Sequence, residues 1–343
     1  MPNDVLTAAI DALASRRDLS QDETAAVLEE VMTGNASEVQ TAAFLIALRT
    51  KGETVEEVAG LARTMRELAT PVRTTRADLL DTAGTGGGRP TFNVSTTAAF
   101  IAAGAGCALA KHGNRSATGL SGSADVLEAL GARIDLAPEA VARCIDEIGF
   151  GFMFAPSHHA AMRFVVPVRK DLAVRTVFNV LGPLTNPAGA RRQLIGVSDA
   201  GMLDVMAGAL QRLGVDRALL VASADGLDEL STSGSTHVVE VDGTAAPRRY
   251  DVTPEELGLE RVAPESIPAG TPDANAATAR AILAGEPGPA RDLAVLNAGA
   301  AIYAAGRAED LRTGIDAAVA AVDSGAAADT LRRYVALSQE LAA

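Results

Sequence analysis

The residues best suited to chemistry lie in one glycine-rich stretch. Four of the five residues from Gly84 to Gly88 are glycine. In a regular element each glycine would cost roughly 0.5–1 kcal/mol relative to alanine, so the conformation of the backbone itself is needed here. An apolar run at 77–83 precedes the glycines and predicts a buried strand, and the residues at 97–103 predict a helix.

A strand, a glycine turn and a helix N-terminus in succession are suited to binding an anion. Exposed N–H groups and the positive end of the helix dipole converge on the same point. Asn93, Ser95 and Thr96 are of types that cap helices. The spacing matches neither G-x-x-x-x-G-K-[ST] nor G-x-G-x-x-G. Two interpretations therefore stand, a phosphate-binding loop and a glycine-rich turn without a ligand.

Two further polar clusters follow predicted strands. The run Lys-His-Gly-Asn-Arg at 111–115 follows apolar residues 107–110, and the adjacent carboxylates Asp228 and Glu229 follow an apolar run at 218–222. Ligands of α/β sheets bind at the carboxyl ends of strands, so these clusters and the glycine loop are expected to share one cleft. Facing a polyphosphate, the carboxylates would be oxygen ligands for magnesium; elsewhere they would be a solvated surface pair.

A fourth cluster holds two of the chain's four histidines, His158 and His159, followed by Arg169. No carboxylate or cysteine stands there in metal-ligand spacing, so zinc is not expected. Arg169 has the geometry to clamp a carboxylate with two hydrogen bonds, although an ordinary helix-surface arginine is the alternative. The chain has no G-x-S-x-G motif and no cysteine in a nucleophile setting, which favours positioning and electrostatics over covalent catalysis.

The elements that position these residues fall into two groups. Residues 1–70 predict helices only, whereas from residue 78 onward apolar strands alternate with helices. Such alternation is typical of a largely parallel sheet flanked by helices. In the first group, capping boxes are expected to begin at Ser20, Ser37 and Thr54. Ser121 is expected to cap a helix at 124–130, and the carboxyl-terminal third is expected to hold helices near 273–284, 291–306 and 309–341.

The composition limits the partners. The net charge is −13, which argues against a nucleic-acid or anionic-membrane surface and requires a local basic pocket for an anionic substrate. The amino terminus has no basic start and no apolar run approaches 18 residues, so a cytoplasmic protein is expected. Cys107 and Cys144 stand in no metal or redox spacing and are expected to be buried thiols.

Taken in order, these motifs resemble those of the anthranilate phosphoribosyltransferase family. The resemblance extends over nearly the whole chain and rests on Gly84-Thr-Gly-Gly87, Asn93-Val-Ser-Thr96, Lys111-His-Gly-Asn-Arg115, Ser121-Gly-Ser-Ala-Asp125, Phe154-Ala-Pro156 with His159, Thr176–Pro187, Asp225-Gly-Leu-Asp-Glu229 and Asn297–Tyr303. It implies transfer of the phosphoribosyl group of 5-phosphoribosyl-1-pyrophosphate to the amine of anthranilate, with Mg²⁺, in tryptophan biosynthesis.

The resemblance also implies a fold. A small all-helical domain would join a large α/β domain with a central, mostly parallel sheet flanked by helices, of the nucleoside phosphorylase and phosphoribosyltransferase class. The helical domain would span 1–72 with a return segment at about 165–190, and the α/β domain, which binds the phosphoribosyl pyrophosphate, would span 73–164 and 191–343. A homodimer joined through the helical domain is expected.

Residue roles follow from the matching positions, and none is covalent. The phosphoribosyl pyrophosphate would be held by Gly84, Thr85, Gly87, Gly88, Asn93, Ser95, Thr96, Lys111 and Ser123. Anthranilate would be held by Gly84, His112, Asn114, His159 and Arg169. The metal ligands would be Ser95, Asp228 and Glu229.

Two positions depart from the family pattern. Gly88-Arg89 stand where the family normally has Asp-Gly, and Ala160 stands where proline often follows the histidine pair. The first departure touches the pyrophosphate and metal site, where it changes the local charge from −1 to +1. Three other functions stay open: the same transfer to a different aromatic amine, a nucleoside phosphorylase of related fold, and a non-catalytic nucleic-acid-binding relative. The net charge and the intact 111–115 motif argue against the last.

Overall fold

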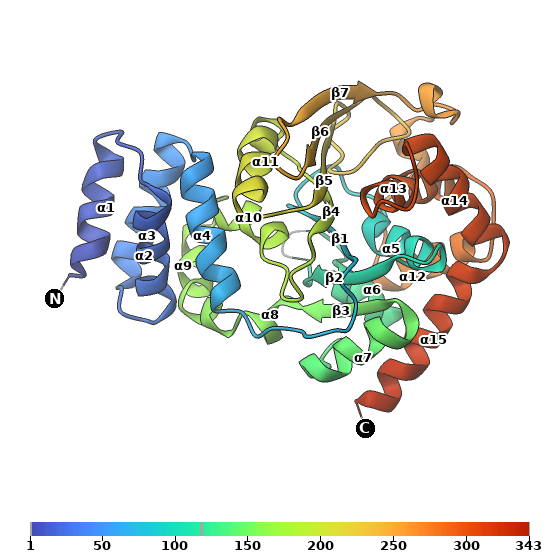
Figure 1. Cartoon of the computed structure of the whole chain (residues 1–343), viewed down its shortest axis with the longest axis horizontal. Coiled ribbons are helices and arrows are strands. Elements are labelled where there is room, and N and C mark those ends of the chain that lie inside the picture. Colours follow the sequence, from blue (N-terminus) through green and yellow to red (C-terminus); the bar gives the residue numbers. More distant parts are fainter. Residues whose placement is uncertain (1, 117–118, 343) are drawn as a thin grey trace.

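The computed structural model describes residues 2–116 and 119–342. A helical amino-terminal domain stands beside an α/β domain built on a seven-stranded sheet (Figure 1). The helical domain begins with α1 (Asp4–Ala14), α2 (Gln21–Met32), α3 (Glu38–Lys51) and α4 (Val55–Glu67). Ser20 and Thr54 form capping boxes as predicted. Ser37 caps α3, but the Gln40 amide is hydrogen-bonded to the backbone of Asn3 and completes no box.

The sheet has the strand order β3-β2-β1-β4-β5-β6-β7. Its strands are β1 (Leu79–Gly84), β2 (Ala108–Gly113), β3 (Phe150–Phe154), β4 (Arg192–Gly196), β5 (Arg217–Ser223), β6 (Thr236–Asp242) and β7 (Arg248–Val252). Strands β1 to β5 are mutually parallel. Strand β6 is antiparallel to β5, and β7 is antiparallel to β6. The strand order reverses between β1 and β4, and such a switch point is where the loops of an open sheet leave a crevice for a ligand.

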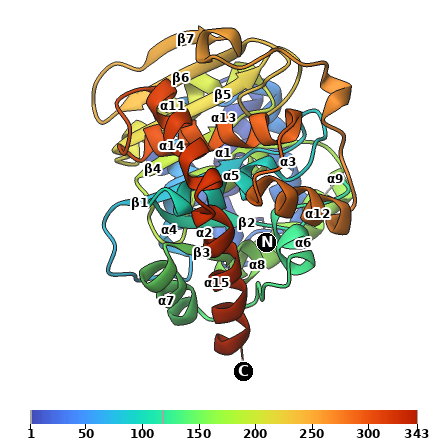
Figure 2. The ribbon, with the colours of Figure 1, turned by 90° about the vertical axis from the view of Figure 1, so that its right-hand side faces the viewer.

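Long helices cover the sheet on the side away from the helical domain (Figure 2). The apolar helix α5 (Val94–Gly104) packs against α13 (Pro289–Ala304), α14 (Leu311–Asp323) and α15 (Ala326–Leu341). Within this core Phe100 and Phe150 stack with their ring centroids 4.2 Å apart, and Tyr334 meets the Phe150 ring edge to face. The remaining helices of this part are α6 (Ser123–Ala129), α7 (Pro138–Ile148) and α12 (Pro272–Leu283).

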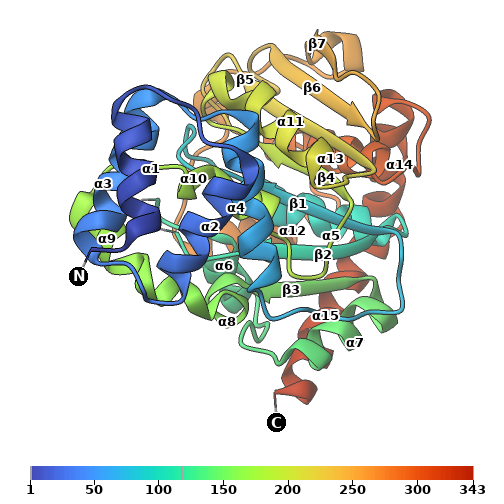
Figure 3. The same ribbon diagram turned by 60° about the vertical axis from the view of Figure 1, so that its left-hand side comes forward.

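A second hydrophobic core connects the helical domain to the opposite face of the sheet. It runs without interruption from Leu45 through Val168 and Leu181 to Leu210 and Leu220. The intervening elements are α8 (Ala155–His158), α9 (Val166–Leu172), α10 (Phe178–Leu181) and α11 (Leu203–Arg212). Figure 3 shows α8 and α9 beside the amino-terminal helices and α11 over β5 and β6. The chain therefore returns to the helical domain after β3.

The remaining short elements are 3₁₀ turns at η1 (Ala160–Phe164), η2 (Gly182–Leu184), η3 (Ala200–Met202), η4 (Glu255–Leu257) and η5 (Pro264–Ser266). No helix in the described ranges has both the length and the apolar character that a membrane crossing requires.

Three local predictions were wrong. Lys111 and His112 belong to β2 rather than to the loop after it, because the strand continues along β3 as far as Gly113. Gly122, not Ser121, is the N-cap residue of α6. The helix expected at 309–341 is two helices, separated at Gly325, whose φ of +78° suits glycine.

Candidate functional site

A cavity of about 1070 Å³ lies at the carboxyl ends of the parallel strands, between the α/β domain and the returning segment α8–α10. All but one of the residues predicted to bind substrate or metal line it. They are Gly84, Thr85, Gly87, Gly88, Asn93, Ser95, Lys111, His112, Asn114, Ser123, His159, Arg169, Asp228 and Glu229. The exception is Thr96, which is buried in α5 outside the cavity lining. The glycine loop, the 111–115 cluster and the 228–229 pair thus line one cleft, as predicted, and the cluster after β3 lines it as well.

The glycine loop after β1 is attached to the neighbouring strand β4. The backbone N–H of Thr85 donates to the carbonyl of Gly196 at 2.9 Å, and the Thr85 hydroxyl accepts a bond from the N–H of Ser198 at 3.0 Å. Gly86 and Gly87 have φ values of +65° and +87°, a conformation that favours glycine. The loop therefore needs its glycines for its backbone path across the switch point.

Helix α5 starts at the edge of the cavity without a side-chain cap. Asn93 holds the N-cap position, but its side chain bonds to Ser121 and Asn275 instead. The first turn of α5 consequently keeps backbone N–H groups that no side chain caps, beside the glycine loop. A helix N-terminus of this kind attracts a phosphate group.

Lys111 supplies a buried positive charge beneath the loop. Its ammonium group donates to the carbonyl of Thr82 and lies 3.3 Å from the hydroxyl of Ser95. Burial lowers the pKa of Lys111 to about 8, and the negative charges of Asp81 and Glu229 oppose this shift. Asp81 is itself buried and is held by Asn186 at 2.7 Å and by the N–H of His112 at 3.1 Å.

Of the paired carboxylates after β5, Asp228 lies directly against the glycine loop. Burial raises the pKa of both Asp228 and Glu229, and for Glu229 the neighbouring Asp228 raises it further. A side-chain carbon on Gly88 would stand 2.4 Å from Oδ1 of Asp228 and 2.8 Å from its backbone nitrogen. The glycine at this position is therefore what lets the loop approach Asp228.

The carboxylate pair suits a magnesium ion. The described residues contain no group of three or more histidine, cysteine or acidic side chains placed to hold a metal. Mg²⁺ fits such a donor set because it usually takes one or two protein carboxylates and completes its shell with phosphate oxygens and water. A cation between Asp228 and Glu229 would also stabilise the ionised forms that burial disfavours.

The other end of the cavity presents neutral rings and an unpaired cation. The rings of His112 and His159 lie 5.1 Å apart, and within the described ranges the Nε2 atom of each has no hydrogen-bond partner. Burial lowers their pKa values to about 3 and about 4, so both rings are neutral near pH 7. Arg169 is half-buried with its guanidinium 5.7 Å from the Phe178 ring centroid, and no described carboxylate lies within 4 Å of it. A carboxylate would pair with Arg169. The Nε2 atom of His112 would accept a bond from an amine, because the Nδ1 of that neutral ring donates to the carbonyl of Gly182.

Sequence reasoning missed one residue that joins the two ends. Arg175 donates to the carbonyl of Gly86 at 3.1 Å and to the hydroxyl of Ser198 at 3.0 Å, so it connects the returning segment to the glycine loop. It lies in a loop and carries no periodic signal. The sequence signal that could have identified it is its position directly before the family motif that begins at Thr176. Arg115, by contrast, pairs with Asp125 and Glu128 rather than remaining free for a ligand.

Comparison with known proteins agrees with this arrangement. Residues 76–328 match the model of the glycosyl transferase family, a/b domain, and residues 7–69 match that of the glycosyl transferase family, helical bundle domain. An anthranilate phosphoribosyltransferase of Rubrobacter xylanophilus is 52% identical over 340 residues, which cover 98% of this chain and 99% of that protein. One of Chloroflexus aggregans is 52% identical over 333 residues, covering 96% and 98%.

Solved structures give the same result. The anthranilate phosphoribosyltransferase of Thermus thermophilus superimposes with a TM-score of 0.91 at 47% identity, covering 96% of this chain and 99% of that one. The enzyme of Saccharomyces cerevisiae, in complex with PRPP and Mg, has a TM-score of 0.89 at 26% identity, covering 98% of each chain. The chain belongs to the anthranilate phosphoribosyltransferase family.

Proposed function

We propose that the cavity binds 5-phosphoribosyl-1-pyrophosphate with Mg²⁺ at the glycine-loop end and anthranilate at the end that holds His112, His159 and Arg169. The chain transfers the phosphoribosyl group to the amine of anthranilate, giving N-(5-phosphoribosyl)anthranilate and pyrophosphate in tryptophan biosynthesis. The observation that carries the proposal is that one cavity has paired carboxylates beside a glycine loop at one end and, at the other, a half-buried arginine that pairs with no described carboxylate.

The reaction forms a bond from the amine nitrogen to ribose C1 and breaks the bond from C1 to the pyrophosphate oxygen. The amine loses a proton, and pyrophosphate leaves with the bonding electron pair. The amine is already nucleophilic, so the chain contributes mainly alignment and charge stabilisation. Magnesium, when bound, supplies positive charge to the departing pyrophosphate.

For most of the predicted residues the position in the cavity supports a role. The backbone of the glycine loop and the first turn of α5 would bind phosphate oxygens, with Lys111 as the buried cation behind them. Asp228 and Glu229 would hold the metal, together with the Ser95 hydroxyl. Arg169 would clamp the anthranilate carboxylate, and the neutral histidines would border its ring. Thr96 lies outside the cavity, so we assign it to the packing of α5.

A second copy of the chain would cover the outer face of the helical domain. Val5 of α1 and Val39 and Ile46 of α3 are exposed by 39%, 79% and 37%, an apolar grouping that a lone domain has little reason to keep. We therefore propose a homodimer joined through α1 and α3. We also propose the domain division given above, with the segment at about 165–190 as part of the helical domain. Analytical ultracentrifugation of Val39→Glu beside the native protein tests the dimer.

The test of function is the loss of anthranilate fluorescence. The assay contains the protein, anthranilate, 5-phosphoribosyl-1-pyrophosphate and Mg²⁺, and each component is omitted in turn. Loss of signal only in the complete mixture supports the proposal. The alternative acceptor, a different aromatic amine, is not favoured by the names of the relatives. It predicts no loss with anthranilate but pyrophosphate release with another amine of a panel.

A further inference from the structure

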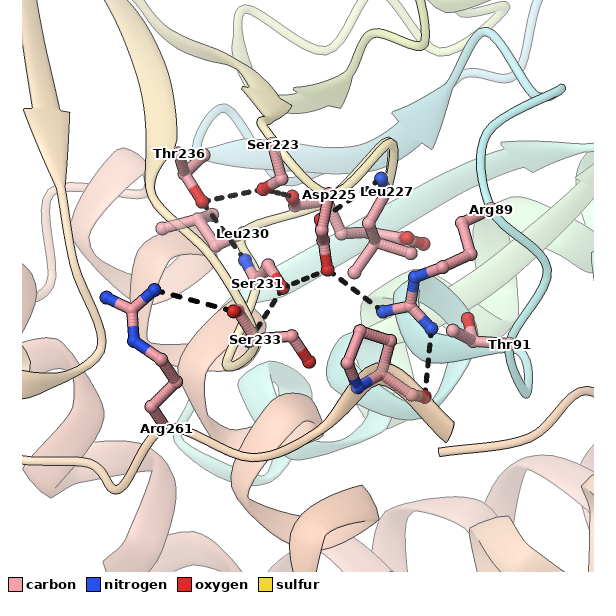
Figure 4. Close-up of polar contacts among 12 residues, drawn as sticks. Arg89, Thr91, Ser223, Asp225, Leu227, Leu230, Ser231, Ser233, Thr236 and Arg261 are labelled. Carbon is pink, nitrogen blue, oxygen red and sulfur yellow. Dashed lines mark hydrogen bonds and ion pairs between the residues drawn. The ribbon is translucent and has the colours of Figure 1, made fainter. Parts of the chain in front are cut away.

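Arg89 joins the glycine loop to the loop after β5 through two contacts and to η5 through a third, and Figure 4 shows the two that its guanidinium makes. Its backbone N–H donates to the carbonyl of Gly226 at 2.6 Å. Its guanidinium forms an ion pair with Asp225 at 3.1 Å and donates to the carbonyl of Pro264 at 3.1 Å. One side chain therefore joins the loops that carry the phosphate-binding backbone and the metal-binding carboxylates.

Asp225, the ion-pair partner of Arg89, is itself held in place by hydrogen bonds. The Asp225 carboxylate accepts a bond from the Ser231 hydroxyl at 2.8 Å and another from the N–H of Leu227 at 3.3 Å. Ser231 in turn is bonded to Thr236 of β6 and to Ser233 (Figure 4). Asp225 is thus tied to the sheet, and Arg89 transmits that fixed position to the glycine loop.

The ion pair is shielded from water, since the Arg89 and Asp225 side chains are exposed by 20% and 11%. Solvent therefore screens it less than an ordinary surface pair, whose contribution is typically small. Because Arg89 is ion-paired with Asp225, its positive charge is not free to attract a pyrophosphate. The contact between Gly88 and Asp228 lies immediately beside this pair, so the position of Arg89 sets the spacing between loop and carboxylates.

We propose that Arg89 is a positioning residue for the donor end of the cavity. Through Asp225 it holds the glycine loop at the spacing from Asp228 and Glu229 at which one magnesium pyrophosphate group reaches both. This inference rests on the proposed function, because it assigns the ligand of that same site. It predicts that loss of the pair weakens donor binding and leaves anthranilate binding alone.

The variants are Arg89→Ala, Arg89→Lys, Asp225→Asn and the double variant Arg89→Ala/Asp225→Asn. Arg261→Ala is the matched control, because Arg261 contacts Ser233 of the same cluster at 3.5 Å and pairs with Glu255, but touches no residue of the glycine loop. Two readouts do not depend on turnover: hydrogen exchange of peptides covering 84–92 in the free protein, and calorimetric binding of 5-phosphoribosyl-1-pyrophosphate with Mg²⁺. Steady-state KM for each substrate is the third.

Arg89→Ala is expected to exchange faster over 84–92 and to raise the Kd of the donor about tenfold, within the range measured for contacting pairs. The KM for anthranilate should stay within about twofold of native. Arg89→Lys should restore part of the loss, and the double variant should bind no worse than Arg89→Ala, since each change breaks the same pair. Arg261→Ala should match native in all three readouts.

If Arg89→Ala has the same exchange rates and the same donor Kd as the native protein, the proposal is overturned, and the ion pair contributes to stability only. An equal loss in Arg261→Ala would do the same, because the effect would then belong to the whole cluster. If Arg89→Ala does not fold, Arg89→Lys decides by the same criteria. If the folded native protein binds no donor, the proposed function fails, and hydrogen exchange still shows whether Arg89 restrains the loop.

Discussion

The two ends of the cavity are built in different ways. At the donor end the side chains that shape the site are already engaged: Thr85 with β4, Lys111 with Thr82, and Arg89 with Asp225. At the acceptor end, among the described residues, the Nε2 atoms of His112 and His159 have no partner. A buried polar group without a partner costs about 1–3 kcal/mol. The donor end is therefore set before its ligand arrives, whereas the acceptor end is completed by its ligand.

The strongest test of the donor end removes its charge. Asp228→Asn and Glu229→Gln should each lower kcat/KM by at least ~10²-fold, about 2.7 kcal/mol, because each removes an oxygen charge from the proposed metal site. Steady-state kinetics at several magnesium concentrations measures this. Near-native activity in both variants would make the pair a structural feature of the loop.

Arg169 tests the acceptor end. Arg169→Ala should raise the KM for anthranilate about 10- to 100-fold, which corresponds to the free energy of a hydrogen bond to a charged group. The KM for the donor should stay nearly unchanged. Arg169→Lys should recover only part of the loss, because the planar fork is absent. An equal rise in both KM values would show that Arg169 does not distinguish the two ends.

His112 tests whether the acceptor end carries a cost in stability. Burial lowers its pKa to about 3 in the folded chain, against about 6.5 in the unfolded chain. Below pH 6.5 the unfolded state therefore binds a proton at this ring and the folded state does not. The free energy of unfolding should fall as the pH drops from 6.5 toward 3. Asp81, whose pKa burial raises to about 6, acts in the opposite direction.

The measurement therefore compares native protein with His112→Gln by urea denaturation at pH 7 and pH 5. The native protein should lose roughly 1–2 kcal/mol more than the variant over this interval. Parallel losses in the two proteins would mean that His112 is not held neutral by its surroundings.

Gly88 gives the smallest expected effect. A side-chain carbon there meets Asp228, so Gly88→Ala and Gly88→Asp should both displace the loop and shift the magnesium optimum a few-fold. A magnesium titration at fixed donor and anthranilate compares both with native. A shift in Gly88→Asp alone would assign the effect to charge, and three superimposable curves would show that position 88 does not influence the metal site.

The sequence allowed the fold class and most of the residues that line the cavity to be predicted, because glycine spacing, strand-ending polar clusters and family motifs are local signals. Contacts between distant segments were not predictable. Arg175 meets Gly86 across 89 residues, and Arg89 meets Asp225 across 136. Local polarity also gave one wrong prediction. Lys111 is a charged residue in a polar run and was therefore expected in a loop, but it lies in a strand, where Thr82 and Ser95 form hydrogen bonds with its ammonium group.

The core that joins the helical domain to the sheet has a consequence for synthesis of the chain. Helices α1–α4 leave the ribosome first, but the apolar side chains that cover them, from Val165 to Val241, are made much later. Helices α1–α4 also pack on one another, but at roughly 5–20 residues per second the apolar side chains that face the later segments stay uncovered for on the order of ten seconds or more. The nascent amino-terminal segment is thus the part of this protein that most needs protection from aggregation in the cell.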